Sequence, residues 1–366
     1  MFWRTTIAGA GIALLALAGC TSVAPSATPT AAPPSAPPST PASSPALTEA
    51  STLTVVTHDS FAISDAAKAK FASDTGYKVT YIAPGNAGTV VNQLILTKDS
   101  PTGDVVFGID NTFAGRAIGA GVLSPYQSPA LPSGAAALAA DDSGALTPID
   151  YGDVCINADN RWFTAHKLPV PATLDDLAKP EYKDLLVVPN PATSSPGLSF
   201  LVATVGAKGD PGYLDYWKSL KANGVKVVDG WTQAYTVEFS GSSGKGSRPL
   251  VLSYASSPAA EVGKDGKAPT SALPQTCFRQ VEYAGVIAGA SNEVGARKFI
   301  DFMLSDQVQS EIPDQMWMSP VNPNAKIPAD WAKYTGVVTN PITVPASDIS
   351  AKRDAWLQAW TQAVIG

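Results

Sequence analysis

From residue 53 onward the chain alternates short β-branched runs with helical segments, and this alternation limits the fold more than any other feature. Strand composition is found at 53–57, 78–82 and 104–109, and helical patterns lie between them at 66–74 and 89–96. Strand-helix-strand units predict an α/β fold with a parallel sheet, because parallel neighbours need a crossover connection. In such sheets ligands sit beyond the carboxyl ends of the strands.

The middle of the chain repeats this alternation, which predicts a second α/β domain. Its expected strands are 185–188, 225–228 and 250–252, and its expected helices are 174–178, 198–205 and 211–222. Two further strands, at 146–156 and 280–287, would carry the chain from one domain to the other and back. We therefore expect residues 51–150 plus 285–366 to form the first domain and residues 151–284 the second, with a hinge and a ligand cleft between them.

The C-terminal part is predicted to return to the first domain. A helix at 293–304 carries an apolar stripe on one face, as a helix packed on a sheet would. Residues 307–320 are expected to form a loop that leads back toward the cleft, and a last helix is expected at 352–364.

The N-terminus has the layout of a secretory signal, with a positive charge at Arg4, then an apolar run, then Cys20. Residues 17–20 (LAGC) match a bacterial lipobox, so we expect a signal peptide at 1–19 and lipidation of Cys20. The alternative is an ordinary signal peptide with a chance cysteine. Residues 20–50 are almost wholly Ser, Thr, Ala and Pro, which is typical of an extended tether. The protein is therefore expected outside the cytoplasm, anchored to the cell membrane by its lipid.

Charge and motifs exclude several functions. Asp and Glu number 31 against 25 Lys and Arg, a formal net charge of −6. Without a basic cluster, nucleic acid is not an expected partner, and a positively charged ligand is weakly favoured. The chain has no Walker-type Gly-Lys-Ser/Thr loop, so ATP hydrolysis would belong to another protein.

Two cysteines remain after Cys20. Cys155 and Cys277 would most simply form a disulfide in an exported protein, the alternative being two separately buried thiols. Their spacing fits no zinc motif, and only His58 and His166 could supply imidazole ligands. We predict no metal site and no cofactor, and we expect a monomer.

Seven segments carry a resemblance to a known family. They are THDSF (57–61), VFGIDN (106–111), IDYG (149–152), PATSSPG (191–197), GWTQAY (230–235), LSYASSP (252–258) and IPDQMWMSPV (312–321). In order and spacing they resemble segments of the thiamine-binding periplasmic proteins, and the resemblance extends over residues 53–366. Two positions depart from the family's pattern, because that family usually carries Tyr where this chain has His58 and Ala260.

The resemblance implies a fold and a function. The fold would be the two-domain, type II periplasmic-binding-protein fold, which closes around its ligand by a hinge motion. The ligand would be thiamine, or its mono- or diphosphate, and the partners would be the permease and ATPase of an ABC importer. The chain would then be a binding protein and not an enzyme. Alternatives of the same fold are binders of a phosphonate, a polyamine, a sugar, a thiamine precursor or ferric iron, although the adjacent tyrosines of the iron binders are absent.

Thiamine joins an aminopyrimidine to a cationic thiazolium, so its site needs aromatic faces and a carboxylate. The resemblance places the aromatic candidates Trp231, Tyr235, Tyr254 and Trp317 in cleft loops, where a cation–π contact contributes about 0.5–2 kcal/mol. The other tryptophans are expected to pack in the core or on the surface, namely Trp162, Trp217, Trp331, Trp356 and Trp360.

The polar candidates lie at the ends of predicted strands and at the start of a predicted helix. Asp59, beside His58, and Asp110 end two strands, and either would meet the cation or the exocyclic amine, with helix N-capping as the alternative. Ser194, Ser195 and Gly197 lead into a helix, whose N–H groups would suit a phosphate.

A hydrolase is the remote alternative. A Ser-x-x-Lys match begins at Ser242 and ends at Lys245, but it lies in a Gly/Ser-rich segment without the partner motifs of penicillin-recognising enzymes. No Gly-x-Ser-x-Gly elbow is present either.

Overall fold

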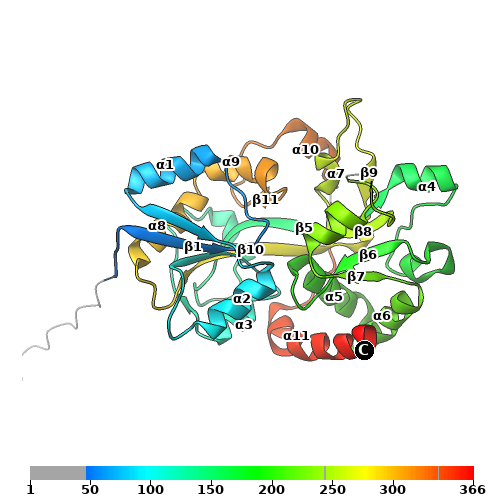
Figure 1. Cartoon of the computed structure of the whole chain (residues 1–366), viewed down its shortest axis with the longest axis horizontal. Helices are drawn as coiled ribbons and strands as arrows, with labels where there is room; N and C mark the ends of the chain where they lie inside the picture. Colours follow the sequence, from blue (N-terminus) through cyan, green and yellow to red (C-terminus); the bar gives the residue numbers. More distant parts are fainter. Residues whose placement is uncertain (1–46, 243–244, 337) are drawn as a thin grey trace, which may run out of the picture. The chain divides into compact units, whose positions relative to one another are not determined.

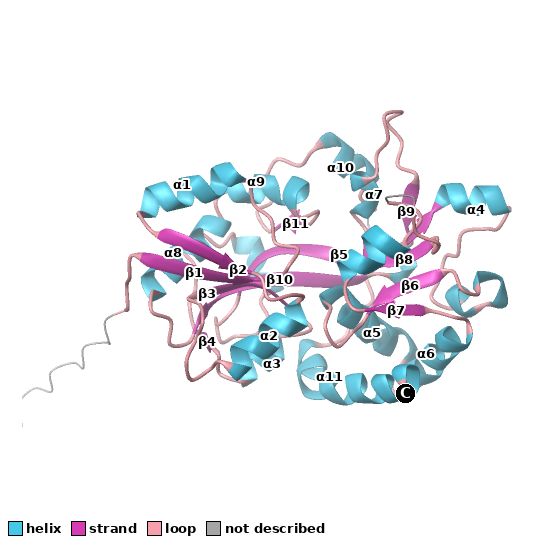
Figure 2. Ribbon diagram, in the orientation of Figure 1, coloured by secondary structure: helices cyan, strands magenta, loops and turns pink. Residues whose placement is uncertain are grey.

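The computed structural model describes residues 47–242, 245–336 and 338–366, and these residues form a layered α/β structure (Figures 1 and 2). The predicted signal peptide, Cys20 and all but the last residues of the predicted tether lie outside the described residues. In the part of the chain that the structure describes, no helix is long and apolar enough to cross a membrane.

The elements follow one another largely as the alternation predicts. The strands are β1 (Thr52–Thr57), β2 (Lys78–Ile82), β3 (Val105–Asp110), β4 (Leu123–Ser124), β5 (Thr147–Asp159), β6 (Leu186–Pro189), β7 (Lys226–Val228), β8 (Leu250–Tyr254), β9 (Thr270–Ala272), β10 (Phe278–Ile287) and β11 (Ser319–Pro320). The α-helices are α1 (Asp65–Thr75), α2 (Ala87–Leu96), α3 (Ala114–Gly119), α4 (Asn160–His166), α5 (Ser195–Lys208), α6 (Gly212–Ala222), α7 (Ser257–Ala260), α8 (Glu293–Met303), α9 (Asp306–Gln315), α10 (Ala329–Tyr334) and α11 (Ala346–Trp360). A π-helical turn spans Gln233–Glu238.

The sheet consists of two parallel halves joined by two long antiparallel strands. Its order is β2-β1-β3-β10-β5-β8-β6-β7. β1 is parallel to β2 and β3, and β6 is parallel to β7 and β8. Between the halves, β10 and β5 pair with each other and with their outer neighbours antiparallel, and they run through the middle of the molecule (Figure 2). They are the two crossing strands that the sequence predicts.

Helices cover both faces of the sheet and bury apolar side chains against it (Figure 2). The predicted stripe of α8 is fully buried, and Phe299 of this helix packs edge-on against Phe71 of α1. In the other half, Trp217 of α6 packs edge-on against Trp360 of α11. Of the five tryptophans expected to pack, four are at least nine-tenths buried, and Trp162 is half-buried and stacked on His166.

Two C-terminal segments differ from expectation. Residues 307–320 are not a continuous loop, since α9 occupies the first part, capped by Ser305 and held by the buried Val308 and Ile312 one turn apart. The predicted helix at 352–364 begins earlier, at Ala346, and packs against α3, α5 and α6. It therefore contacts elements of both predicted domains, whose boundaries stay a prediction.

The folded part begins before the expected end of the tether. The Thr48 hydroxyl donates to the carbonyl of Ala290 at 2.9 Å, and the carboxylate of Glu49 accepts a hydrogen bond from Tyr77 at 2.6 Å. Asn292 of the α8 cap donates to the carbonyl of Ala50 at 2.9 Å. These bonds fix residues 48–50 against β2 and α8.

Cys155 and Cys277 are joined, with an S–S distance of 1.97 Å. Cys155 belongs to β5 and Cys277 directly precedes β10, so the bond ties the two crossing strands together at the end that lies in the second half. Both residues are fully buried.

Candidate ligand-binding cleft

A cleft with a cavity volume of about 120 Å³ opens where the two half-sheets meet. Residues of both halves line it, namely His58, Asp59, Ser60, Asn86, Ala87, Ser195, Pro196, Trp231, Tyr235, Tyr254, Ser257, Ala260, Glu282, Met316, Trp317 and Met318. Both positions that depart from the family's pattern are therefore in the lining.

Topology explains why these residues meet. His58 follows β1, Asn86 follows β2, and from the other half Ser195 follows β6, Trp231 follows β7 and Tyr254 ends β8. In each half, these are the carboxyl ends of parallel strands, which lie at one edge of a sheet. The two edges face the same cleft.

The second half supplies a paired aromatic wall. The rings of Trp231 and Tyr235 stack with centroids 5.0 Å apart and an interplanar angle of 12°. The Trp231 indole donates to Ser253 at 2.9 Å, and the Tyr235 hydroxyl donates to Glu261 at 2.9 Å. Burial, then the nearby Glu261 carboxylate, raises the pKa of Tyr235 well above its usual range. The wall is thus held by hydrogen bonds behind it.

Trp317 supplies a ring from the first half. Its backbone lies in the left-handed region, with φ of 58°, which is rare for a bulky residue and marks a conformation imposed by its surroundings. The Ser256 hydroxyl donates to its carbonyl at 2.6 Å, and Trp331 of α10 stacks on its ring at 6.1 Å. The strained backbone turns this indole toward the cleft between Met316 and Met318.

Glu282 brings a carboxylate into the cleft from the crossing strand β10. It is 5% exposed, and its cross-strand neighbours are Asp110 on β3 and Asp150 on β5. Both neighbours are fully buried. Burial, and then the Glu282 carboxylate, raises the pKa of Asp150 well above its usual range. Three acidic side chains therefore lie side by side across the middle of the sheet.

His58 is the basic partner of this row. Its Nε2 lies 3.5 Å from a carboxylate oxygen of Glu282, and its Nδ1 accepts a hydrogen bond from the Ser60 N–H at 3.0 Å. Burial acts to lower the pKa of His58, but the carboxylates of Glu282, Asp59 and Asp110 together raise it above its usual value. Because Nδ1 accepts the bond from Ser60, the proton of the neutral imidazole lies on Nε2, which faces Glu282.

Seven of the ten predicted ligand-binding residues line the cleft, and Asp110, Ser194 and Gly197 do not. Asp110 lies behind the lining, where it accepts hydrogen bonds from the Ser195 hydroxyl and from both the N–H and the hydroxyl of Thr112. Burial raises the pKa of Asp110 despite those bonds. Its geometry is that of a residue that positions Ser195.

Ser194 and Gly197 have packing roles in the ligand-free protein. Ser194 is buried at the N-cap position of α5. A Cβ on Gly197 would lie 2.6 Å from the carbonyl oxygen of Pro189, so the glycine lets α5 approach β6. The capping alternative for Asp59 is wrong, because Ser64 caps α1 and Asp59 is exposed at the cleft.

The lining also holds residues that the sequence did not single out, among them Glu282, Asn86, Ser257 and the two methionines beside Trp317. Glu282 had a readable signal, since an acidic residue followed by the apolar part of a crossing strand is rarely buried without a role. The methionines had none, because they lie in a segment expected as a loop.

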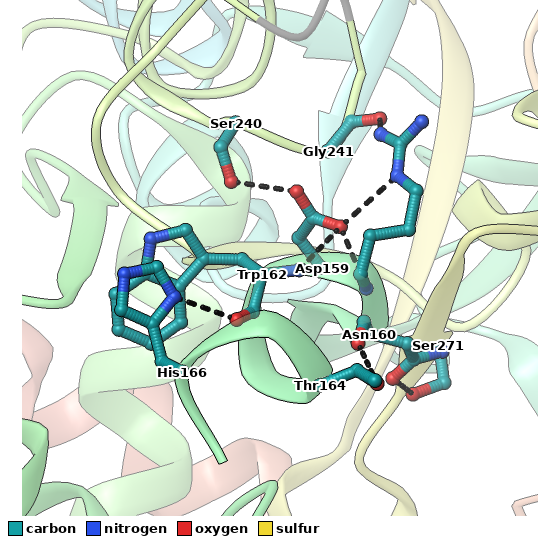
Figure 3. A network of polar contacts seen from close by, with 9 residues as sticks. Asp159, Asn160, Trp162, Thr164, His166, Ser240, Gly241 and Ser271 are labelled. Atoms are coloured by element: carbon teal, nitrogen blue, oxygen red, sulfur yellow. Dashed lines mark hydrogen bonds and ion pairs between the residues drawn. The ribbon is translucent and has the colours of Figure 1, made fainter. Parts of the chain in front are cut away.

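A second cavity lies away from this cleft and is lined in part by Asn160, Arg161 and Thr164 of α4. Next to its lining residues Arg161 and Gly241 lies a network in which Asp159 accepts hydrogen bonds from the Arg161 N–H at 3.1 Å and from the Ser240 hydroxyl at 2.8 Å (Figure 3). Ser242 donates to the carbonyl of Tyr235 at 2.5 Å, and residues 243–244 of the Ser-x-x-Lys match lie outside the described residues. Among the described residues, no cluster of His, Cys, Asp and Glu is placed to hold a metal ion.

Two half-sheets joined by crossing strands, with a cleft where their carboxyl ends meet, define a type II periplasmic binding protein. Residues 100–339 match the family of bacterial extracellular solute-binding proteins, and the chain belongs to this family. Members of the family bind solutes.

Its relatives include thiamine-binding periplasmic proteins. That of Escherichia coli is 31% identical over 85% of this chain and 93% of its own length, and that of Brucella suis is 28% identical over 85% and 92%. A solved periplasmic thiamin binding protein superposes with a TM-score of 0.75 at 28% identity, covering 86% of this chain and 96% of its own. A ferric binding protein from Campylobacter jejuni, with a TM-score of 0.69 at 17% identity over 85% and 99%, shares the fold alone.

Proposed function

We propose that this chain captures thiamine in the cleft and delivers it to the permease and ATPase of an ABC importer. The observation that carries the proposal is the chemistry of the lining, in which aromatic rings face two carboxylates and no Lys or Arg side chain is present among the described lining residues. Such a site suits a flat molecule with a positive charge.

Each part of thiamine finds a partner of matching chemistry. The Trp231 and Tyr235 wall offers a broad face for one ring, and the indole of Trp317 offers another from the opposite half. Asp59 and Glu282 carry the negative charge that a thiazolium needs. Hydroxyls of Ser195 and Ser257 lie within the same lining for the ring edges and the hydroxyethyl arm.

Thiamine phosphates remain part of the proposal. Ser195 and Pro196 line the cleft at the start of α5, a helix of 14 residues whose first N–H groups suit a phosphate. His58 would supply the only basic side chain in that lining. We propose thiamine as the principal ligand and its mono- and diphosphate as further ligands.

We infer that the chain acts as a binding protein rather than as an enzyme, outside the cytoplasm and anchored through lipidated Cys20. The lipobox sequence and the tether composition support the anchor. A chain held in this way would pass its ligand to a membrane permease nearby.

Tryptophan fluorescence tests the proposal. The chain is titrated with thiamine, its mono- and diphosphate, spermidine and ferric ion, because Trp231 and Trp317 line the cleft and report occupancy. Saturable quenching by thiamine is the expected result. Silence toward every thiamine form, or tighter binding of spermidine or iron, would contradict the proposal.

A further inference from the structure

The two rings of the aromatic wall differ in what holds their polar edges. Trp231 and Tyr235 both line the cleft. The Trp231 indole donates to the Ser253 hydroxyl at 2.9 Å, and Ser253 is hydrogen-bonded to the Ser257 hydroxyl at 2.8 Å, so its partners are neutral. The Tyr235 hydroxyl instead donates to a carboxylate oxygen of Glu261 at 2.9 Å. One ring of the wall is therefore bonded to a carboxylate and the other is not.

Glu261 lies behind the wall and outside the cleft lining. It directly follows α7, whose Ser257 and Ala260 do line the cleft. Glu261 itself lines the second cavity, together with Arg161 and Asp265. Its carboxylate can therefore influence a ligand in the cleft only from behind the Tyr235 ring, without contact.

The surroundings of Glu261 are compatible with a negative charge. Burial raises the pKa of Glu261, and the hydrogen bond from Tyr235 and the positive charge of Arg161 act against that rise. The Arg161 guanidinium itself pairs with Asp159 at 3.3 Å and donates to the carbonyl of Gly241 at 3.2 Å. A carboxyl group in water titrates near about pH 4.3, so this half-buried side chain is ionised at neutral pH.

A carboxylate in this position changes the charge distribution of the tyrosine ring. A phenol that donates to a carboxylate forms a charge-assisted hydrogen bond, which polarises the phenol and makes its oxygen and ring more negative. A cation is attracted to a ring face electrostatically, so a more negative ring attracts it more strongly. A neutral ring that stacks on the same wall gains little from this polarisation.

We propose that Glu261 is a specificity-determining residue, which favours a positively charged ring in the cleft without touching it. Its carboxylate acts through the Tyr235 hydroxyl and makes the wall more attractive to a cation than neutral hydrogen-bond partners would. The inference deepens the proposed function and rests on it for the identity of the ligand, thiamine.

Paired calorimetric titrations of the full chain in detergent measure this preference. One ligand is thiamine, and the other is an analogue in which a neutral thiophene ring replaces the thiazolium. The ratio of the two Kd values reports how strongly the cleft prefers the charge. A change in the shape of the cleft would weaken both ligands alike and leave this ratio unaltered.

Glu261→Gln removes the charge and keeps the geometry, because the amide oxygen can accept the same hydrogen bond from Tyr235. Thiamine binding should weaken about threefold or more, while binding of the thiophene analogue should change less than about twofold. Asp265→Asn is the matched control. It makes the same charge change in the same cavity, at a carboxylate that accepts a hydrogen bond from the Lys267 N–H, and should leave both Kd values unchanged. An unaltered ratio in Glu261→Gln would overturn the inference.

Tyr235→Phe tests the route by which the charge acts. This variant keeps the ring and removes the hydroxyl that joins it to Glu261. In the Tyr235→Phe background, Glu261→Gln should therefore have little further effect on the ratio of Kd values. Fully additive effects of the two changes would show that Tyr235 does not transmit the charge, and the inference would fail.

A ligand-free readout separates this inference from the proposed function. A tyrosine bonded to a carboxylate absorbs at longer wavelength than one bonded to a neutral acceptor. The near-ultraviolet spectrum of Glu261→Gln should therefore shift to shorter wavelength relative to the parent, and that of Asp265→Asn should not. If no thiamine form binds while the shift is present, the proposed function fails and the inference stands. If thiamine binds and the shift is absent, the inference fails and the proposed function stands.

Discussion

Trp317 combines three features that are rarely found together on a packing residue. It lines the cleft, its backbone has a positive φ of 58°, and its ring is backed by Trp331. Holding a bulky residue in the left-handed region costs about 1–3 kcal/mol, and other interactions of the folded protein must offset this cost. Such a cost is expected where the position of a side chain matters for binding.

Trp317→Ala should weaken thiamine binding at least about tenfold, because one aromatic face is lost, which corresponds to about 1.4 kcal/mol. The melting temperature of the ligand-free protein should stay unchanged, since the ring is only half-buried. The matched control is Trp162→Ala, which removes an indole stacked on His166 of the same helix, α4 (Figure 3). Equal affinity of the two variants would remove Trp317 from the site.

Asp150 gives a stability prediction at the same scale. Below about pH 4 its carboxyl is protonated in both folded and unfolded chains. As pH rises the unfolded chain ionises first, because burial raises the folded pKa, so the free energy of unfolding falls until pH passes that folded value. Asp150→Asn should therefore raise the free energy of unfolding at neutral pH by about 1–3 kcal/mol, and by almost nothing near pH 4.

Urea denaturation at both pH values measures this difference. Asp215→Asn is the control, because its side chain is 81% exposed and pairs with Lys218 on the same helix. A neutral-pH destabilisation by Asp150→Asn would mean that the ionised carboxylate is needed by the fold.

At the scale of elements, the sequence predicted the strands and the crossings but not every boundary. Period-two runs of β-branched residues are local signals, so β1, β3 and the crossing strands β5 and β10 were readable. α9 was not, because Pro313 and a polar composition hide the two buried residues that hold it. Polar residues after strands and the family resemblance together predicted seven of the residues that line the cleft, whereas the acid row needed the register of three strands that are distant in the sequence.

The disulfide is an element-scale device, since it joins β5 to the residue before β10 across 122 positions of the chain. Replacing Cys155 and Cys277 together by Ser should lower the free energy of unfolding by about 2–4 kcal/mol, because the unfolded chain gains freedom. The midpoint of urea denaturation checks this, with the parent protein under reducing conditions as the matched comparison. An unchanged midpoint would show that packing of the crossing strands suffices.

The whole molecule depends on how closely the two halves approach each other. The Gly88 N–H of α2 donates to the carbonyl of Thr193 at 3.1 Å, and Ser195 donates to Asp110, so loops of the predicted second domain touch elements of the first. A Cβ on Gly88 would lie 2.8 Å from the carbonyl oxygen of Ala192. Backbone atoms cannot yield as a side chain can, so an added methyl group must push the halves apart.

Gly88→Ala should therefore weaken thiamine binding about tenfold or more while leaving each half folded, because hinge closure completes the site. Small-angle X-ray scattering with saturating thiamine should give a larger radius of gyration for this variant than for the parent. Gly119→Ala is the matched control, since no atom lies within 4 Å of the added methyl group on α3. If Gly88→Ala bound thiamine as tightly as Gly119→Ala, the approach of α2 to residues 192–193 would have no part in closure, and the ligand would be held by the two walls without the contact between them.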